Sequence, residues 1–235
     1  MVTPTMNILT ELQRRVDEMY LAVNSLFSHP SWATIGDSVL YSSRLLQDPV
    51  LRAMVELRMN APLRCGVHKA RETLWQRTIE ASTVIRTPKY CMKTLHLSKT
   101  SYQKIYMIIL DGPARSVELH GTAYIQRFSD AHRFAYVWGS AISSSREGEC
   151  FREKGCMMTS RSSTNAHFPT LLQGYYQLSG DTSSAEATSL LAKEQREFVL
   201  KTLGSRTQAQ IQLMQDMLLD EFAGFQSRGS LLLSH

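Results

Sequence analysis

Residues 114–144 decide the fold of this chain: they read ARSVELHGTAYIQRF (114–128), a polar SDA (129–131) and HRFAYVWGSAISS (132–144). Both longer segments are rich in β-branched and aromatic residues, which favour strands. In the first segment, alternate positions place five small or apolar residues on one face: Val117, Leu119, Gly121, Ala123 and Ile125. In the second, Phe134, Tyr136 and Trp138 share a face. A period of two over such lengths predicts two adjacent antiparallel strands with two distinct faces.

The composition is that of an ordinary globular protein. The chain has 235 residues, of which 43% are hydrophobic and 20% charged, enough for one large domain or one domain with a helical annex. The sequence contains no run of eighteen apolar residues that would span a bilayer. Its first twenty residues include acidic side chains where a signal peptide needs an apolar core. We therefore expect an intracellular protein, cytoplasmic or nuclear.

Positive charge is concentrated in one part of the sequence. The net charge is +5, and residues 51–115 hold twelve Lys and Arg against four Asp and Glu. These charges occur singly, without a basic block or a recognisable DNA-reading motif. A solvated basic face is therefore favoured over a nucleic-acid interface.

The N-terminal segment predicts an amphipathic helix that begins near Thr3-Pro4 and ends before Pro30. Its apolar residues follow an a/d spacing: Leu9, Leu12, Val16, Met19, Val23 and Leu26. This seam is compatible with a coiled-coil partner, and equally with a helix that packs on its own domain. Because the seam covers only about two and a half heptads, the second interpretation is favoured.

The rest of the chain predicts helices on both sides of a β-region. We expect a broken helical segment at 44–59 and a helix at 68–81. Strands are expected at 83–86, 90–97, 101–110, 155–160 and 168–178, in addition to the opening pair. A capping box at Ser183 predicts a helix that Gly204 ends, and Ser205 opens a last helix.

This order of elements predicts an α+β fold, with a curved antiparallel sheet packed on a long C-terminal helix. That arrangement is the helix-grip architecture, which commonly encloses a cavity between helix and sheet. The expected organisation is an N-terminal helical segment (1–62), the helix-grip domain (63–225) and a flexible tail (226–235).

Several stretches, in this order, resemble one protein family: LTELQRRVDEMYLAV, ARETLWQRTI, AYIQRFSDAHRFAYVWGS, EGECFREKGCMMTSR and IQLMQDMLLDEF. The chain resembles the START-like proteins abundant in oomycetes, often labelled mating-specific proteins, from about Leu9 to Phe222. The resemblance implies a START-like helix-grip fold and binding of a hydrophobic ligand, and we expect a non-enzymatic role. Many relatives carry a basic, leucine-zipper-like segment upstream of the matching region.

No residue pattern in the sequence predicts catalysis, a cofactor or a metal site. The seven histidines never fall at i, i+4, and none has zinc-finger spacing to a cysteine. His120 and His132 are expected on adjacent strands, where ordinary surface positions are favoured over a metal site. Cys150 and Cys156 could approach across a hairpin, but free thiols are favoured. Neither a nucleophile elbow nor a phosphate-binding loop is present.

The candidate site is therefore a cavity inside the sheet. The residues expected to line it are Tyr106, Tyr124, Arg127, Phe134, Tyr136, Trp138, Met158, Tyr175, Met214 and Leu218. A mostly apolar pocket with a few hydroxyls would suit a lipid-like ligand. The alternative is a solid core in an interaction or transcription-associated module, which would pair with a partner through its N-terminal helix.

Overall fold

The computed structural model describes residues 4–28, 39–48, 52–80, 85–112, 116–130, 133–144, 149–162, 166–181 and 190–223. Its helices are α1 (Pro4–Phe27), α3 (Val67–Glu80) and α4 (Leu190–Ala223). Its strands are β1 (Leu40–Asp48), β2 (Arg52–Leu63), β3 (Ile85–Thr87), β4 (Tyr90–Leu97), β5 (Ser101–Asp111), β6 (Ser116–Ser129), β7 (Arg133–Ser144), β8 (Cys150–Arg161) and β9 (Thr170–Asp181). Of these described helices, none is long and apolar enough to cross a membrane.

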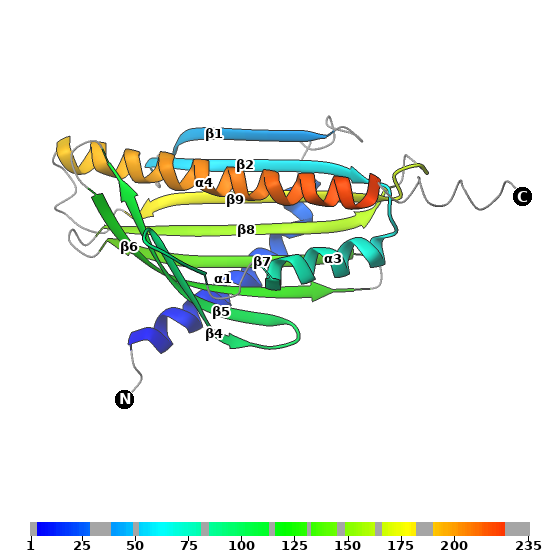
Figure 1. Cartoon of the computed structure of the whole chain (residues 1–235), viewed down its shortest axis with the longest axis horizontal. Coiled ribbons are helices and arrows are strands. Elements are labelled where there is room, and N and C mark those ends of the chain that lie inside the picture. The colour runs from blue at the N-terminus through cyan, green and yellow to red at the C-terminus, as the bar shows by residue number, and fades with distance from the viewer. Residues whose placement is uncertain are drawn as a thin grey trace, which may run out of the picture.

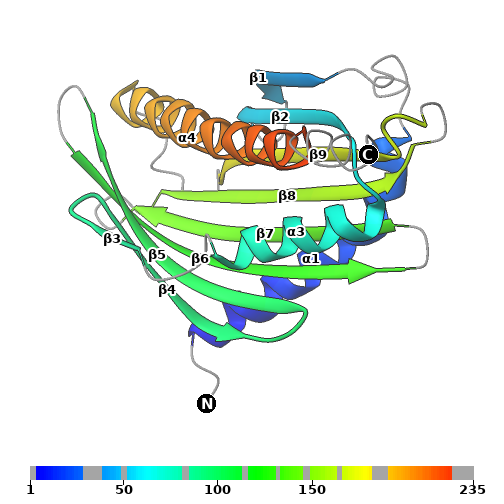
Figure 2. The ribbon, with the colours of Figure 1, turned by 45° about the vertical axis from the view of Figure 1, so that its right-hand side comes forward.

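The strands form one antiparallel sheet in the order β1-β2-β9-β8-β7-β6-β5-β4-β3. Helices α3 and α4 lie on one face of the sheet, and α1 lies on the opposite face (Figure 1). The β3–β5 end curls around toward the side of α3 and α4, which Figure 2 shows from a second direction. We call the face under α4 the inner face and the face under α1 the outer face. This is the α+β helix-grip fold that the sequence predicts.

The opening stretch forms β6 and β7, which are paired as predicted, with Ile125 opposite Trp138 and Ala123 opposite Ser140. The alternation also holds. Ile125 and Tyr136 belong to the inner core with α3 and α4, whereas Val137 belongs to the outer core with α1. Two separate hydrophobic layers therefore share these strands.

The apolar seam of helix α1 packs against the sheet of the same chain. Leu12, Val16 and Val23 are at most 2% exposed and pack on the outer face of the sheet. Tyr20 stacks on Phe128 of β6, with ring centroids 3.9 Å apart. The interpretation of an amphipathic helix packed on its own domain is therefore the correct one, because the sheet already covers the residues that a partner helix would need.

The helical prediction for residues 44–59 is wrong, since this segment forms β1 and β2. The odd-numbered residues of β2 are buried on the inner face: Val55, Leu57, Met59, Ala61 and Leu63. Hydrogen bonding to β9 runs along most of β2. The apolar spacing fits both a helix and a strand, and pairing with β9 decides between them. The expected domain boundary at 62/63 falls within β2, so the sheet includes part of the predicted N-terminal segment.

Gly204 does not end a helix, because α4 continues through it to Ala223. A Cβ atom at this position would lie 2.9 Å from Cγ1 of Val55 on β2. The glycine therefore allows the helix to approach the sheet closely, although glycine is unfavourable inside a helix. The capping box at Ser183 and the predicted tail at 226–235 lie outside the described residues.

Strand β8 begins five residues earlier than predicted, at Cys150. Cys150 and Cys156 consequently lie on the same strand, about 20 Å apart at the usual rise per residue, and cannot bond to each other. Cys65, Cys91 and Cys156 are likewise not in a disulfide among the described residues.

Candidate functional site

A cavity of about 470 Å³ lies between the inner face of the sheet and α4. Strands β4–β9 supply its floor and walls, and α4 covers it. The strand residues that line it are Tyr90, Tyr102, Lys104, Tyr106, Ile108, Ala123, Ile125, Tyr136, Trp138, Glu153 and Tyr176. Helix α4 adds Leu203, Arg206, Thr207, Gln210, Ile211, Leu213, Met214 and Met217, and α3 adds Arg77, Thr78 and Glu80. The lining is mostly aromatic and aliphatic, with a few polar groups gathered together.

The polar groups of the cavity centre on the carboxylate of Glu153. Tyr176 donates a hydrogen bond to Glu153 Oε1 at 2.7 Å, and Ser140 donates one to Oε2. The Tyr106 hydroxyl lies 3.3 Å from Oε2 and 3.1 Å from Ser140 Oγ. Thr207 of α4 lies 3.4 Å from the Tyr176 hydroxyl and connects the helix to this network. Hydroxyls of this chain therefore hold the carboxylate.

Burial changes the ionisation of the groups around Glu153. Removal from water, and then the Glu153 carboxylate, raise the pKa of the Tyr106 and Tyr176 phenols well above the ordinary value. Burial lowers the pKa of Lys104, against the opposing effect of Glu153. The phenols are consequently neutral donors at physiological pH.

Two cations share the cavity with Glu153. Lys104 Nζ lies 5.8 Å from the centre of the Tyr106 ring, and Arg206 of α4 lies over the Tyr90 ring at 4.5 Å. Lys104 and Glu153 occupy the same row across the sheet, separated by Ala123 and Ser140. The small side chains between them leave room above the floor.

Two glycines fix the aromatic walls. Gly121 lies opposite Tyr106, and Gly155 lies opposite Trp138. A Cβ atom at either glycine would lie 2.1 Å from the ring of its partner. Trp138 can therefore lie across β8, where it also stacks between Tyr136 and Tyr176, with centroids at 5.4 Å and 6.5 Å.

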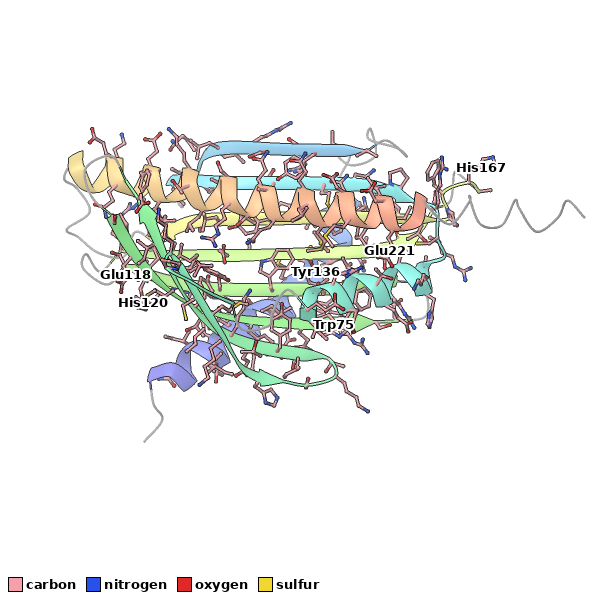
Figure 3. All side chains as sticks on the ribbon, in the orientation of Figure 1. Trp75, Glu118, His120, Tyr136, His167 and Glu221 are labelled. Carbon is pink, nitrogen blue, oxygen red and sulfur yellow. The ribbon has the colours of Figure 1, made fainter. Side chains whose placement is uncertain are left out.

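The rim of the cavity lies between α3 and α4. Arg77 of α3 pairs with Glu80 at 3.1 Å and reaches Glu221 of α4 at 3.4 Å. Leu213 and Met217 of α4 line the cavity and are exposed. Figure 3 shows Tyr136 between α3 and α4, with Glu221 on α4 and Trp75 on α3.

The predicted site residues divide into four groups. Tyr106, Tyr136, Trp138 and Met214 line the cavity. Phe134 and Leu218 are buried in the inner core beside it but are not among its lining residues. Arg127 lies outside, where it covers the Trp75 ring of α3 at 5.5 Å.

The other three predicted residues lie on the wrong face. Tyr124, Met158 and Tyr175 belong to the outer core under α1, so the sheet separates them from the cavity. On β9, Tyr176 rather than Tyr175 points inward, because neighbouring side chains of a strand alternate between its faces. The size and apolar character of Tyr124, Met158 and Tyr175 did not by themselves reveal which layer they join.

Sequence reasoning did not select Glu153, Lys104 or Arg206. A signal existed for Lys104, which alternates with Tyr102, Tyr106 and Ile108 and is the charged member of that face. Glu153 was missed because β8 was expected to begin at Gly155. Only the position of α4 over the sheet brings Arg206 to the same cavity.

The side chains that could hold a metal ion were also located in the structure. Among the described residues, no group of three or more His, Cys, Asp and Glu is placed to hold a metal ion. His120 lies 2.7 Å from Glu118 on the same strand, at the end of the sheet away from α3 (Figure 3). Its cross-strand neighbours are Met107 and Ser143, and His132 lies outside the described residues.

A larger hollow of about 1000 Å³ lies on the outer face beside the first turns of α1. Ile8 and Ile105 line it and are 41% and 38% exposed, so it is an open groove on the surface. The smaller cavity under α4 has the buried polar network that can orient a ligand, and we therefore take it as the candidate site.

No protein-family model and no curated protein sequence matches the chain. Among solved structures, human STARD10 is similar at 12% identity over 92% of this chain and 84% of that one, with a TM-score of 0.43. An uncharacterised protein from Rhizobium leguminosarum is similar at 9% identity over 71% of this chain and 99% of that one, with a TM-score of 0.29. At scores this low neither likeness supports a functional conclusion. The fold assignment rests on strand order, register and helix position, and membership of the oomycete family stays a prediction.

Proposed function

We propose that this chain is a non-enzymatic START-like domain that binds a hydrophobic, lipid-like molecule in the cavity between the sheet and α4. The observation that carries the proposal is the composition of this cavity. Its body is aromatic and aliphatic, and its polar groups gather around Glu153. Ligand pockets of this kind gain affinity from the apolar wall and orientation from the few polar groups.

The proposed role is binding without bond making or breaking. Glu153 is held in place by the neutral hydroxyls of Tyr176 and Ser140, an arrangement suited to positioning a ligand. A partner helix on the α1 seam is not favoured as the main function, because Leu12 and Val16 are buried against the sheet of the same chain.

An environment-sensitive apolar dye, Nile red, tests the proposal. The purified chain should enhance its fluorescence with a saturable dependence on concentration. Met214→Trp, which fills the cavity from α4, should reduce this binding by at least tenfold, on the order of the loss of a well-packed apolar group. Ile105→Trp, placed in the outer groove, is the matched control and should leave it unchanged.

Two results would contradict the proposal. Dye binding that only Ile105→Trp weakens would place the ligand in the outer groove. An absence of saturable binding, together with no lipid in native mass spectra of protein purified without detergent, would favour a domain that carries no ligand.

A further inference from the structure

The charged groups inside the cavity do not balance. At the rim, Arg77 pairs with Glu80 at 3.1 Å and with Glu221 of α4 at 3.4 Å, so no unpaired cation is left there among the described residues. Deeper inside, the lining contains two cations, Lys104 and Arg206, against the single carboxylate of Glu153. The interior therefore has one positive charge in excess, which is the complement of a monoanion.

Protein donors already satisfy Glu153. Tyr176, Ser140 and Tyr106 place hydroxyls on its two oxygens, so the carboxylate needs no ammonium partner. Lys104 differs, because its Nζ lies over the face of the Tyr106 ring at 5.8 Å, and the Glu153 carboxylate acts on it through electrostatics rather than through a hydrogen bond that any of these hydroxyls supplies. An ammonium in such a position is unfavourable until an acceptor reaches it.

Arg206 is likewise able to accept a ligand. Its guanidinium lies over the Tyr90 ring at 4.5 Å, a contact that uses the planar face. The N–H groups at its edge remain suited to a carboxylate, which they can bind in a forked geometry. Ala123 and Ser140 between Lys104 and Glu153 leave space for such a head group on the floor.

We infer that the ligand of this cavity is an apolar monocarboxylic acid, with its carboxylate on Lys104 and Arg206 and its hydrocarbon body along Ile125, Tyr136, Ile211 and Met214. This inference rests on the proposed function, since it specifies the ligand class for the same cavity. A volume of about 470 Å³ is at the lower end of the range for pockets that enclose one small organic molecule.

The head group can be tested with three molecules that share one chain: laurate, dodecan-1-ol and dodecylamine. Each is titrated against the Nile red complex of the full chain near neutral pH. Laurate should bind about tenfold or more tightly than dodecanol, because a hydrogen bond to a charged group is stronger than a neutral one. Dodecylamine should bind more weakly than dodecanol, since two cations face it.

Variants identify the groups that bind the carboxylate. Lys104→Met should lower the affinity for laurate by about ten- to a hundredfold and should change the affinity for dodecanol by no more than about twofold. Arg206→Gln should act in the same direction. The matched control is Lys93→Met, because Lys93 is exposed on the outer side of the neighbouring strand. This substitution should change the affinity for neither laurate nor dodecanol. Lys104→Met should remain folded, because it removes a poorly solvated charge and retains the straight chain.

The outcomes separate this inference from the function on which it rests. If laurate and dodecanol displace the dye equally, or if Lys104→Met weakens both equally, the cavity binds apolar molecules without the proposed preference, and the inference is wrong. Preference for dodecylamine would make Glu153 the head-group receptor and would also overturn it. If Nile red binds but laurate does not displace it, the inference is wrong while the proposed function stands. If Nile red does not bind at all, the proposed function fails first.

Discussion

Replacing Gly155 by alanine tests how the aromatic wall of the cavity is held. The new Cβ would lie 2.1 Å from Cζ2 of Trp138 and 2.5 Å from Cε2. Ordinary contact begins at 3.4 Å, so the ring must retreat by roughly 1.3 Å, the difference between the two distances. Tyr136 and Tyr176 stack on the two sides of the indole and limit this movement.

The expected cost follows from two opposing effects. Overpacking of this kind destabilises a core by about 1–3 kcal/mol. Alanine in place of glycine stabilises the fold by about 0.4–1 kcal/mol, because it lowers the conformational entropy of the unfolded chain. We therefore expect Gly155→Ala to lower the free energy of unfolding by about 1–2 kcal/mol. With a slope near 3 kcal/mol per molar urea, the midpoint should fall by roughly 0.3–0.7 M.

Urea unfolding followed by tryptophan fluorescence and by circular dichroism measures this change. Gly66→Ala is the control, since a Cβ there meets nothing within 4 Å, and it should not lower the midpoint. A double-mutant cycle with Trp138→Leu isolates the contact, and in that background Gly155→Ala should be close to neutral. An equal loss with and without Trp138 would refute the reasoning, because the cost would then not come from the indole.

Two further predictions concern the outer layer and the buried phenols. Leu12→Ala should cost about 2–3 kcal/mol of unfolding free energy in urea titrations, because Leu12 is buried on the sheet, whereas the exposed Leu21→Ala should stay within about 0.5 kcal/mol. A loss of self-association by Leu12→Ala without a loss of stability would contradict this packing. Burial raises the pKa of Tyr106, Tyr136 and Tyr176, so above about pH 10 the unfolded chain releases these protons first and stability should fall as pH rises. Urea midpoints measured from pH 8 to 11 should fall less steeply for Tyr136→Phe than for the wild type, and equal slopes would exclude Tyr136 from the effect.

Much of the sheet was predictable because its signal is local. The alternation in 116–129 and 133–144 reflects one buried side chain at every second position, which is a property of each strand by itself. The a/d spacing of α1 likewise predicted an amphipathic helix. Because the seam is short, packing within the chain was favoured over a coiled coil, and the structure confirms this packing. The helix at 67–80 followed from a similar stripe.

The errors occurred where local patterns have two solutions. The apolar spacing of 44–59 fits a helix, but the free edge of β9 offers hydrogen bonds that make β2 a strand. Gly204 has the composition of a helix end, yet its role is set by Val55, about 150 positions earlier in the sequence, which α4 approaches closely. In both places a distant segment changed the outcome.

The sequence by itself determined the class of fold, the two faces of the central strands and a cavity rich in aromatic residues as the candidate site. Tertiary structure decided which aromatics share that cavity, because a strand has two faces and both of them are buried here. Tyr124, Met158 and Tyr175 therefore went to the layer under α1. The same structure brought Lys104, Glu153 and Arg206 together from two strands and a helix, since curvature of the sheet and the approach of α4 are properties of the whole chain.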